Sequence, residues 1–356
     1  MFINSKGVIM KKELLMGTAL VSTLGAASVA EAVTATMSGN HQTGIEFDSP
    51  TGGTDTNAQV NDNNFTVSLS ETTDGGMTIS SSFKLMDENA AAGDIDAGLT
   101  LAFTDGSKLD VINAGNASGS HAVSIPGSAG AEGVTVTSTN SAVTGLDFMT
   151  ASTVQGVEYH TASDFLADGL KMSFSASTDS GAAATATFRT DSHIAIGATY
   201  VTDLGDTAVT LGAGYSDSDG SKTVTNPTND MGGVHVGLSA VTGDLTVAVG
   251  FADGHKNGIS DNGSDEMEGD VVKAGVKYVT GDLTFNIGIA SGEATDNTIG
   301  SSGGSSDSQD VTSASVSYAV ASGVTAILGY TTVEATDEAQ STDDGSAWYI
   351  GANMAF

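Results

Sequence analysis

Charged and imidazole side chains recur at alternate positions in several apolar/polar segments, so that within each segment they share one face. Around a water-filled passage, side chains of this kind can select ions by charge and by width. The simpler alternative is a solvated wall in which each ion pair contributes about 0–1 kcal/mol. For any single residue the solvated wall is the favoured interpretation, but we expect the residues as a set to influence which ions pass. The residues are Lys84, Lys108, Asp110, Glu158, His160, Lys171, Arg189, Asp191, His193, His235, Lys273 and Lys277.

Carboxylates gather in two tracts that are rich in Gly, Ser and Asp, and such oxygen ligands bind Ca²⁺. The spacing matches neither an EF-hand nor a calcium-binding nonapeptide repeat. A solvated acidic rim that concentrates cations is therefore the simpler expectation. We expect no cofactor, with Ca²⁺ at the acidic loops kept as an alternative. The first tract contains Asp261, Asp265, Glu266, Glu268 and Asp270, and the second contains Asp337, Glu338, Asp343 and Asp344.

Catalytic patterns find little support in this chain. His160, His193 and His235 are accompanied by no nucleophile elbow, no zinc-ligand spacing and no Gly-rich phosphate loop. We therefore do not expect an enzyme.

The elements that position these residues are short alternating segments joined by two kinds of connection. Tight turns such as Thr242-Gly243-Asp244 and Thr280-Gly281-Asp282 alternate along the chain with long Gly/Ser/Asp tracts. Alternation with this punctuation predicts an all-β, antiparallel, up-and-down transmembrane barrel. An even number of strands lets the first strand pair with the last. We predict sixteen strands, at about 33–47, 63–72, 77–87, 95–103, 107–113, 153–162, 169–178, 184–202, 207–216, 232–241, 244–252, 270–279, 283–291, 311–320, 324–333 and 346–356.

Aromatic residues on the apolar face lie mainly at the ends of the predicted strands, with aliphatic residues between them. This order predicts two aromatic girdles around a lipid-facing band, whereas a soluble sandwich would not sort aromatics by strand end. The opposite face is Gly, Thr, Ser and Asn, which leaves the interior of a wide barrel filled with water. The girdle residues are Phe103, Tyr200, Tyr215, Phe251, Tyr278, Tyr318, Tyr330, Trp348 and Phe356.

The N-terminal segment has the pattern of a signal peptide, with Lys11-Lys12, a short apolar run and Ala30-Glu31-Ala32 as a cleavage site. We expect residues 1–32 to be removed, translation to start at Met10, and residues 33–356 to form the barrel. The chain has no Cys, and its 43 acidic against 11 basic residues give a formal net charge of −32. This charge repels nucleic acid and attracts cations.

One connection is far longer than the others. Residues 114–152 lack strong charge but contain aliphatic residues such as Val123 and Ile125, together with Phe148. A connection of this length is usually functional or disordered. Because its apolar side chains need cover, we expect it to fold back into the barrel.

With these features the sequence resembles the trimeric general porins of Gram-negative outer membranes, in their alphaproteobacterial form. The matching features are the signal peptide followed by Val33–Phe47, the long third loop, the strand restart at Gly156–Thr161, and the Gly-Asp-Leu-Thr turns at 243–246 and 281–284. The terminal strand Ile350–Phe356 matches as well.

The resemblance implies a sixteen-stranded barrel in the outer membrane, in contact with its lipid, assembled as a homotrimer and narrowed by the loop 114–152. It also implies that the strand ending at Phe356 is read by the barrel-assembly machinery. The chain departs from the family in having only Glu132 and Asp147 as acidic residues on the loop and Arg189 as the one arginine of the mature chain.

The expected function is passive diffusion of small hydrophilic solutes and ions through a water-filled channel that prefers cations. The alternative is a structural or adhesive acidic β-protein at the cell surface that forms no channel. Detergent extraction and heat-modifiable gel mobility would separate the two.

Overall fold

The computed structural model describes most of the chain from residue 33 onward. The described residues are 33–51, 53–87, 98–111, 116–128, 131, 155–179, 190–220, 230–257, 266–296, 305–336 and 344–356. The predicted signal peptide, residues 1–32, lies outside the described residues.

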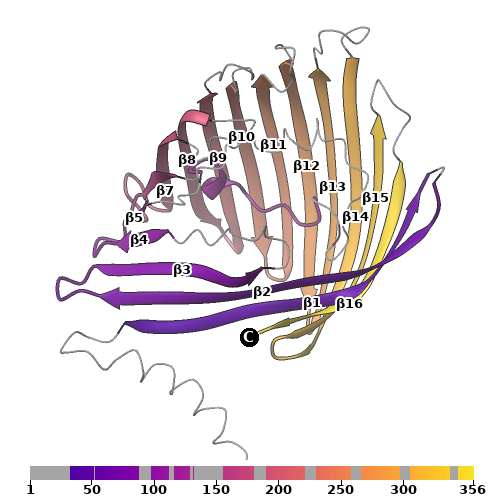
Figure 1. The fold of residues 1–356 in the computed structure, drawn as a ribbon, viewed down its shortest axis with the longest axis horizontal. Helices are drawn as coiled ribbons and strands as arrows, with labels where there is room; N and C mark the ends of the chain where they lie inside the picture. Colours follow the sequence, from indigo (N-terminus) through magenta and orange to yellow (C-terminus); the bar gives the residue numbers. More distant parts are fainter. Residues whose placement is uncertain are drawn as a thin grey trace, which may run out of the picture.

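Sixteen antiparallel strands form a closed barrel in which each strand pairs with its neighbours in sequence (Figure 1). The prediction of strand number and topology is confirmed. The strands are β1 (Thr34–Pro50), β2 (Thr56–Thr72), β3 (Thr78–Asp87), β4 (Leu99–Ala102), β5 (Lys108–Val111), β6 (Gln155–His160), β7 (Leu170–Asp179), β8 (Thr190–Leu204), β9 (Thr207–Gly220), β10 (Asp230–Thr242), β11 (Leu245–Asn257), β12 (Glu266–Thr280), β13 (Leu283–Asp296), β14 (Ser305–Ala321), β15 (Val324–Thr336) and β16 (Gly345–Ala355).

The barrel closes between its first and last strands, where β1 pairs with β16 from Asn40↔Ala355 to Pro50↔Gly345. Every described strand therefore pairs with a neighbour on each side over at least part of its length, and backbone pairing of this kind is what a sheet that crosses a membrane requires. The short connections are tight turns as predicted. Gly243 and Gly281 adopt φ values of 56° and 57°, which a residue without a Cβ reaches without strain.

Several strands extend beyond their predicted ends into the acidic tracts. The structure begins β12 at Glu266 where we predicted about 270, and it continues β13 to Asp296 where we predicted 291. Placing Glu266 and Glu268 in a loop was therefore wrong. Backbone pairing continues past the apolar band, where both faces of a strand are polar and the alternation that marks a strand in sequence is lost.

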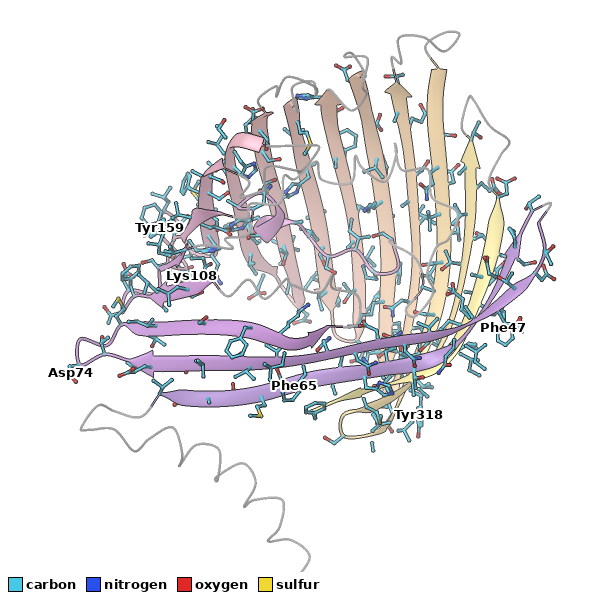
Figure 2. All side chains as sticks on the ribbon, in the orientation of Figure 1. Phe47, Phe65, Asp74, Lys108, Tyr159 and Tyr318 are labelled. Carbon is cyan, nitrogen blue, oxygen red and sulfur yellow. The ribbon has the colours of Figure 1, made fainter. Side chains whose placement is uncertain are left out.

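The two faces of the barrel reverse the usual arrangement of a soluble protein. On β11, Val247 and Val249 are 42% and 46% exposed, whereas Ala248 between them is 1% exposed. Most large apolar side chains therefore point outward, and most inward positions carry small or polar side chains (Figure 2). Ile327, Val333 and Tyr349 are exceptions, because they are buried at inward positions. Among the described residues, no helix is long and apolar enough to cross a membrane.

Candidate functional site

The long connection between β5 and β6 enters the barrel and lies against its inner wall (Figure 1). It is anchored first where it includes the short 3₁₀ helix η2 (Gly119–His121). The Ala117 backbone N–H donates to Ser175 Oγ of β7 at 3.0 Å. The Ser118 carbonyl oxygen lies 2.8 Å from His235 Nε2 of β10.

The same segment is anchored a second time further around the inner wall, at β14 and β15. Ser313 Oγ of β14 donates to the Gly127 carbonyl at 2.5 Å, and the Ala131 N–H donates to Thr331 Oγ1 of β15 at 2.8 Å. Residues 116–128 and 131 thus reach from β7 to β15, so the described part of the third long loop folds into the barrel as predicted, and residues 132–152 lie outside the described residues.

Glycines of the wall form a groove that receives this segment. Any side chain at these positions would meet the loop: a Cβ on Gly197 would lie 2.2 Å from the Ala117 oxygen, and one on Gly275 would lie 2.0 Å from the Pro126 oxygen. Such distances are far below van der Waals contact. The groove is made by Gly197, Gly212, Gly214, Gly237, Gly250, Gly275 and Gly288.

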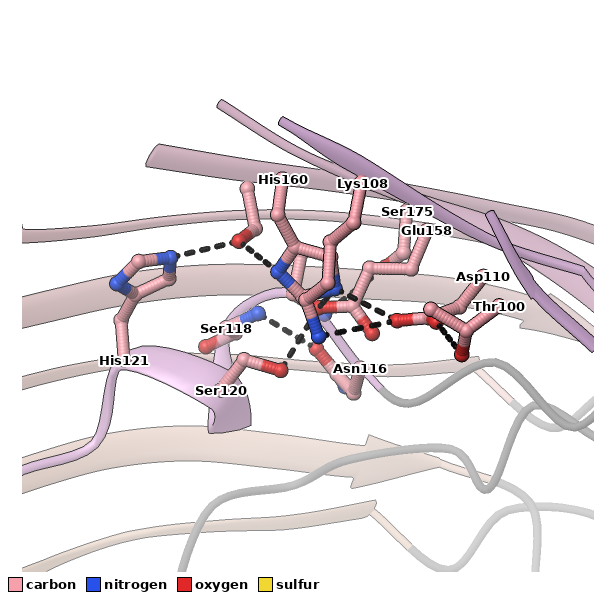
Figure 3. Close-up of polar contacts among 12 residues, drawn as sticks. Thr100, Lys108, Asp110, Asn116, Ser118, Ser120, His121, Glu158, His160 and Ser175 are labelled. Atoms are coloured by element: carbon pink, nitrogen blue, oxygen red, sulfur yellow. Dashed lines mark hydrogen bonds and ion pairs between the residues drawn. The ribbon is translucent and has the colours of Figure 1, made fainter. Parts of the chain in front are cut away.

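A polar network joins the start of the loop to β5, β6 and β7 (Figure 3). His160 Nε2 lies 2.9 Å from Asp110 Oδ2 and 3.4 Å from Glu158 Oε1. On its other side, His160 Nδ1 lies 2.7 Å from Ser173 Oγ, which lies 2.8 Å from His121 Nε2. The network therefore connects the strand carboxylate of Asp110 to the loop imidazole of His121 through His160 and Ser173.

Further bonds complete this network. Ser120 Oγ of η2 donates to Glu158 Oε1 at 2.7 Å, and Glu158 is only 2% exposed. Lys108 Nζ lies 3.3 Å from Asp110 Oδ2, and Thr100 Oγ1 also donates to Asp110. Each of these carboxylates thus has hydrogen-bond donors, as burial of charge requires.

His121 lies in the loop, outside the membrane-spanning strands, and is 7% exposed. Burial lowers its pKa from 6.5 to about 4, and the nearby His160, His235 and Lys171 act in the same direction. The ring is therefore neutral at pH 7. It bonds Thr199 Oγ1 of β8 at 2.6 Å through Nδ1.

The structure divides the predicted wall residues by exposure. Side chains at alternate positions of a strand share one face, and this alternation is called the parity of a residue. Lys84, Lys171 and Lys277 have the parity that points into the barrel, and their side chains are exposed. His193, His235 and Lys273 have the same parity but are 1%, 6% and 8% exposed. Asp191 belongs to β8, although its side chain is outside the described ones, and Arg189, Glu132 and Asp147 lie outside the described residues.

The carboxylates predicted as Ca²⁺ candidates are not brought together with this network. Glu268 and Asp270 share the parity of Val272, which is 51% exposed on the outward face. Glu266 belongs to the same strand, and Asp261 and Asp265 lie outside the described residues.

The predicted girdle aromatics point outward at two levels. Tyr278 and Tyr318 lie beside short turns, while Tyr330 and Trp348 pair near the long-loop end with ring centroids 4.2 Å apart. Phe356 is 70% exposed beyond the end of β16. The other exposed girdle residues are Phe103, Tyr200, Tyr215 and Phe251.

Sequence reasoning missed the residues that anchor the loop. His121 and Ser120 lie in a segment with no periodicity, so no parity could place them, and Ser173 looked like any small wall residue. The glycines of the groove were recognised as small wall positions but not as a contact surface, because the contact comes from a distant segment.

A family model of Gram-negative porins matches residues 17–338. The chain belongs to the Gram-negative porin family. A comparison with curated proteins finds no match. This family membership, with the barrel fold, favours a channel rather than an enzyme.

Solved structures share the fold of this porin at low sequence identity. The outer membrane channel DcaP of Acinetobacter baumannii is 12% identical, with a TM-score of 0.65 over 91% of this chain and 97% of that one. The anion-selective porin from Comamonas acidovorans is 12% identical, with a TM-score of 0.64 over 91% and 100%. The trimer form of OmpT, an outer membrane protein of Vibrio cholerae, is 13% identical, with a TM-score of 0.61 over 92% and 100%. The family and these neighbours support an outer-membrane location.

Proposed function

We propose that this porin forms a water-filled channel for passive diffusion of small hydrophilic solutes and ions, with residues 114–152 as its constriction. The observation that carries the proposal is the docking of residues 116–128 and 131 inside the barrel, from Ser175 on β7 to Thr331 on β15. A segment anchored at these two places occupies a defined part of the lumen cross-section. It can therefore set a fixed width, which a mobile loop could not.

The charge distribution supports a preference for cations. The chain has a net charge of −32, and exposed carboxylates such as Glu293 and Glu334 lie on the outward face near the long-loop ends of their strands, around the channel mouth. Such a field raises the local concentration of cations at a channel mouth. Lys171 and Lys277 on the inner wall act against this preference, so the mouth must dominate.

The test is reconstitution into planar lipid bilayers. We expect stepwise conductance. In a KCl gradient, the reversal potential should have the sign expected of a channel that is more permeable to K⁺ than to Cl⁻. Absence of steps would contradict the channel, and a Cl⁻-type reversal potential would contradict the cation preference alone. Because the chain is a closed barrel, extraction with outer membranes and a heat-induced gel shift no longer separate a channel from a structural or adhesive protein, but the latter would give no conductance steps.

We also propose a homotrimer, which a polar patch on the outward face of β1 and β2 supports. Thr43 Oγ1 donates to Asn61 Oδ1 at 2.8 Å, and His41 bonds Asn63 in the same way. Thr43 pairs with Ala352, between the levels of Trp348 and Phe356. At this depth polar groups facing lipid are costly, so a second copy of the chain would cover them.

Export and assembly belong to the same proposal. We expect cleavage before Val33, which mass spectrometry of the mature protein would detect as its N-terminal residue. The exposed Phe356, at the end of the strand that closes the barrel, is proposed as the signal for the barrel-assembly machinery. The acidic tracts are proposed to gather cations without a defined Ca²⁺ site.

A further inference from the structure

We propose that Asp110, Glu158 and His160 form a binding site for a divalent transition-metal ion, with Zn²⁺ as its probe, on the inner wall where the loop begins to dock. Binding requires only the barrel fold. The effect of binding on conductance rests on the proposed channel, so the two are measured separately.

The ligand atoms are already close to the spacing that such an ion needs. His160 Nε2 lies 2.9 Å from Asp110 Oδ2 and 3.4 Å from Glu158 Oε1, and one ligand atom from each residue lies within 4.8 Å of the others. Zinc bonds of about 2.0–2.2 Å in a tetrahedron put ligand atoms about 3.3 Å apart. A small outward shift of Asp110 would therefore admit the ion, with water at the fourth position.

The surroundings hold these three side chains in place. His160 Nδ1 is bonded to Ser173 Oγ at 2.7 Å, which directs the opposite nitrogen, Nε2, toward the two carboxylates. Glu158 is 2% exposed and accepts from Ser120 Oγ at 2.7 Å. Partners of this kind orient metal ligands and are typical of built metal sites.

The charges favour a cation at this position and indicate how it would enter. Lys108 Nζ lies 3.3 Å from Asp110 Oδ2, and the lysine side chain is 45% exposed. The ammonium can therefore swing into the lumen when a metal ion replaces it. The imidazole ligand favours Zn²⁺ over Ca²⁺, because Ca²⁺ takes 6–8 oxygen ligands. The competing interpretation is that His160 only hydrogen-bonds to the carboxylates and that the three residues bind no metal.

The experiment is a calorimetric titration of the refolded porin in detergent with ZnCl₂, and with CaCl₂ for comparison. We expect one Zn²⁺ per chain that is lost in His160→Ala and in Asp110→Asn. Ser173→Ala should weaken binding by about 10–100-fold, the usual effect of removing an outer partner. His193→Ala is the matched control, because His193 is a buried wall histidine whose Nδ1 bonds Ser218 Oγ; it should bind Zn²⁺ like the wild type.

Lys108→Gln separates the metal site from a simple ion pair. Removing the competing ammonium should tighten Zn²⁺ binding at a real site, in a variant that keeps all three ligands. Heat-modifiable gel mobility establishes that each variant has folded. Absence of Zn²⁺ binding in the wild type, or binding that His160→Ala and Lys108→Gln leave unchanged, would overturn the proposal. Single-channel recordings with added Zn²⁺ then test whether the bound ion reduces conductance.

Discussion

Replacing Gly275 by alanine should lift the docked loop away from the inner wall. The added Cβ would lie 2.0 Å from the Pro126 carbonyl oxygen and 3.0 Å from the Pro126 nitrogen. Both atoms belong to the backbone, so no side-chain rotation can relieve the contact.

The magnitude follows from these distances. Ordinary contact begins at 3.4 Å, so Pro126 must move by about 1.4 Å, and overpacking of this kind costs about 1–3 kcal/mol. Each wall strand is held by a continuous ladder of hydrogen bonds, whereas the docked segment is held by a few separate hydrogen bonds such as that from Ser313 to Gly127, so the segment should move. Its displacement is toward the lumen, and the open channel should conduct less.

Gly250→Ala is the matched control. Its Cβ would lie 2.5 Å from Ile125 Cδ1, the far end of a flexible side chain that can turn aside. We expect a loss of stability below about 0.5 kcal/mol, in the range of neutral substitutions, and conductance near that of the wild type. Both variants add the same methyl group to the same groove.

The assays are single-channel conductance in planar bilayers and denaturant unfolding in detergent. Lower conductance in Gly275→Ala but not in Gly250→Ala would support the docked position of the loop. If the two variants matched the wild type in both assays, the loop would not occupy the groove in the membrane, and the constriction proposal would lose its basis.

Three further predictions concern charge, pH and assembly. Replacing Lys171 and Lys277 together by Gln should raise the ratio of cation to anion permeability, measured as reversal potential, and an unchanged ratio would mean that neither lysine faces the ion path. The pKa of His121 is lowered to about 4 by burial, so its contribution to docking is complete above about pH 6.5, the ordinary value, and declines as pH falls toward 4. The unfolding midpoint should therefore fall more steeply with decreasing pH in the wild type than in His121→Gln. If the two plots of midpoint against pH were parallel, His121 would not be a source of the acid sensitivity. The double variant Thr43→Val/Asn61→Leu removes the bonded polar pair from the outward face; if the pair lies between subunits, unheated gels should show less trimer, and undiminished trimer would place the interface elsewhere.

The strand pattern could be predicted well because it depends on local geometry. Successive side chains of a strand point to opposite faces, so the alternation of Val247, Ala248 and Val249 already identified the two faces. The turn at Gly243 marked where one strand ends and the next begins. The acidic ends of β12 and β13 were missed for the same reason, since a strand that is polar on both faces carries no alternating signal.

The candidate metal residues show how far such reasoning extends. Parity placed Asp110, Glu158 and His160 on one face, yet their convergence depends on the register Asp110↔Glu158 and Lys108↔His160 between β5 and β6. The long insert separates these strands in sequence, so no local pattern gives their register. The metal hypothesis drawn from sequence went instead to the acidic tract around Glu268, of which the structure places Glu268 and Asp270 on the outward face.

The strands and their up-and-down order could be inferred from the sequence, because period-two alternation and turn chemistry are local. The outward direction of the apolar face followed from the aromatic residues at the strand ends, since a soluble sandwich also alternates. Tertiary structure alone decided where the loop lies and what it touches. The groove exists because Gly197, Gly275 and other wall glycines align across paired strands, and His121 reaches Ser173 only after the chain has closed around it. Such contacts join residues far apart in the chain, and nothing local in either segment encodes the other.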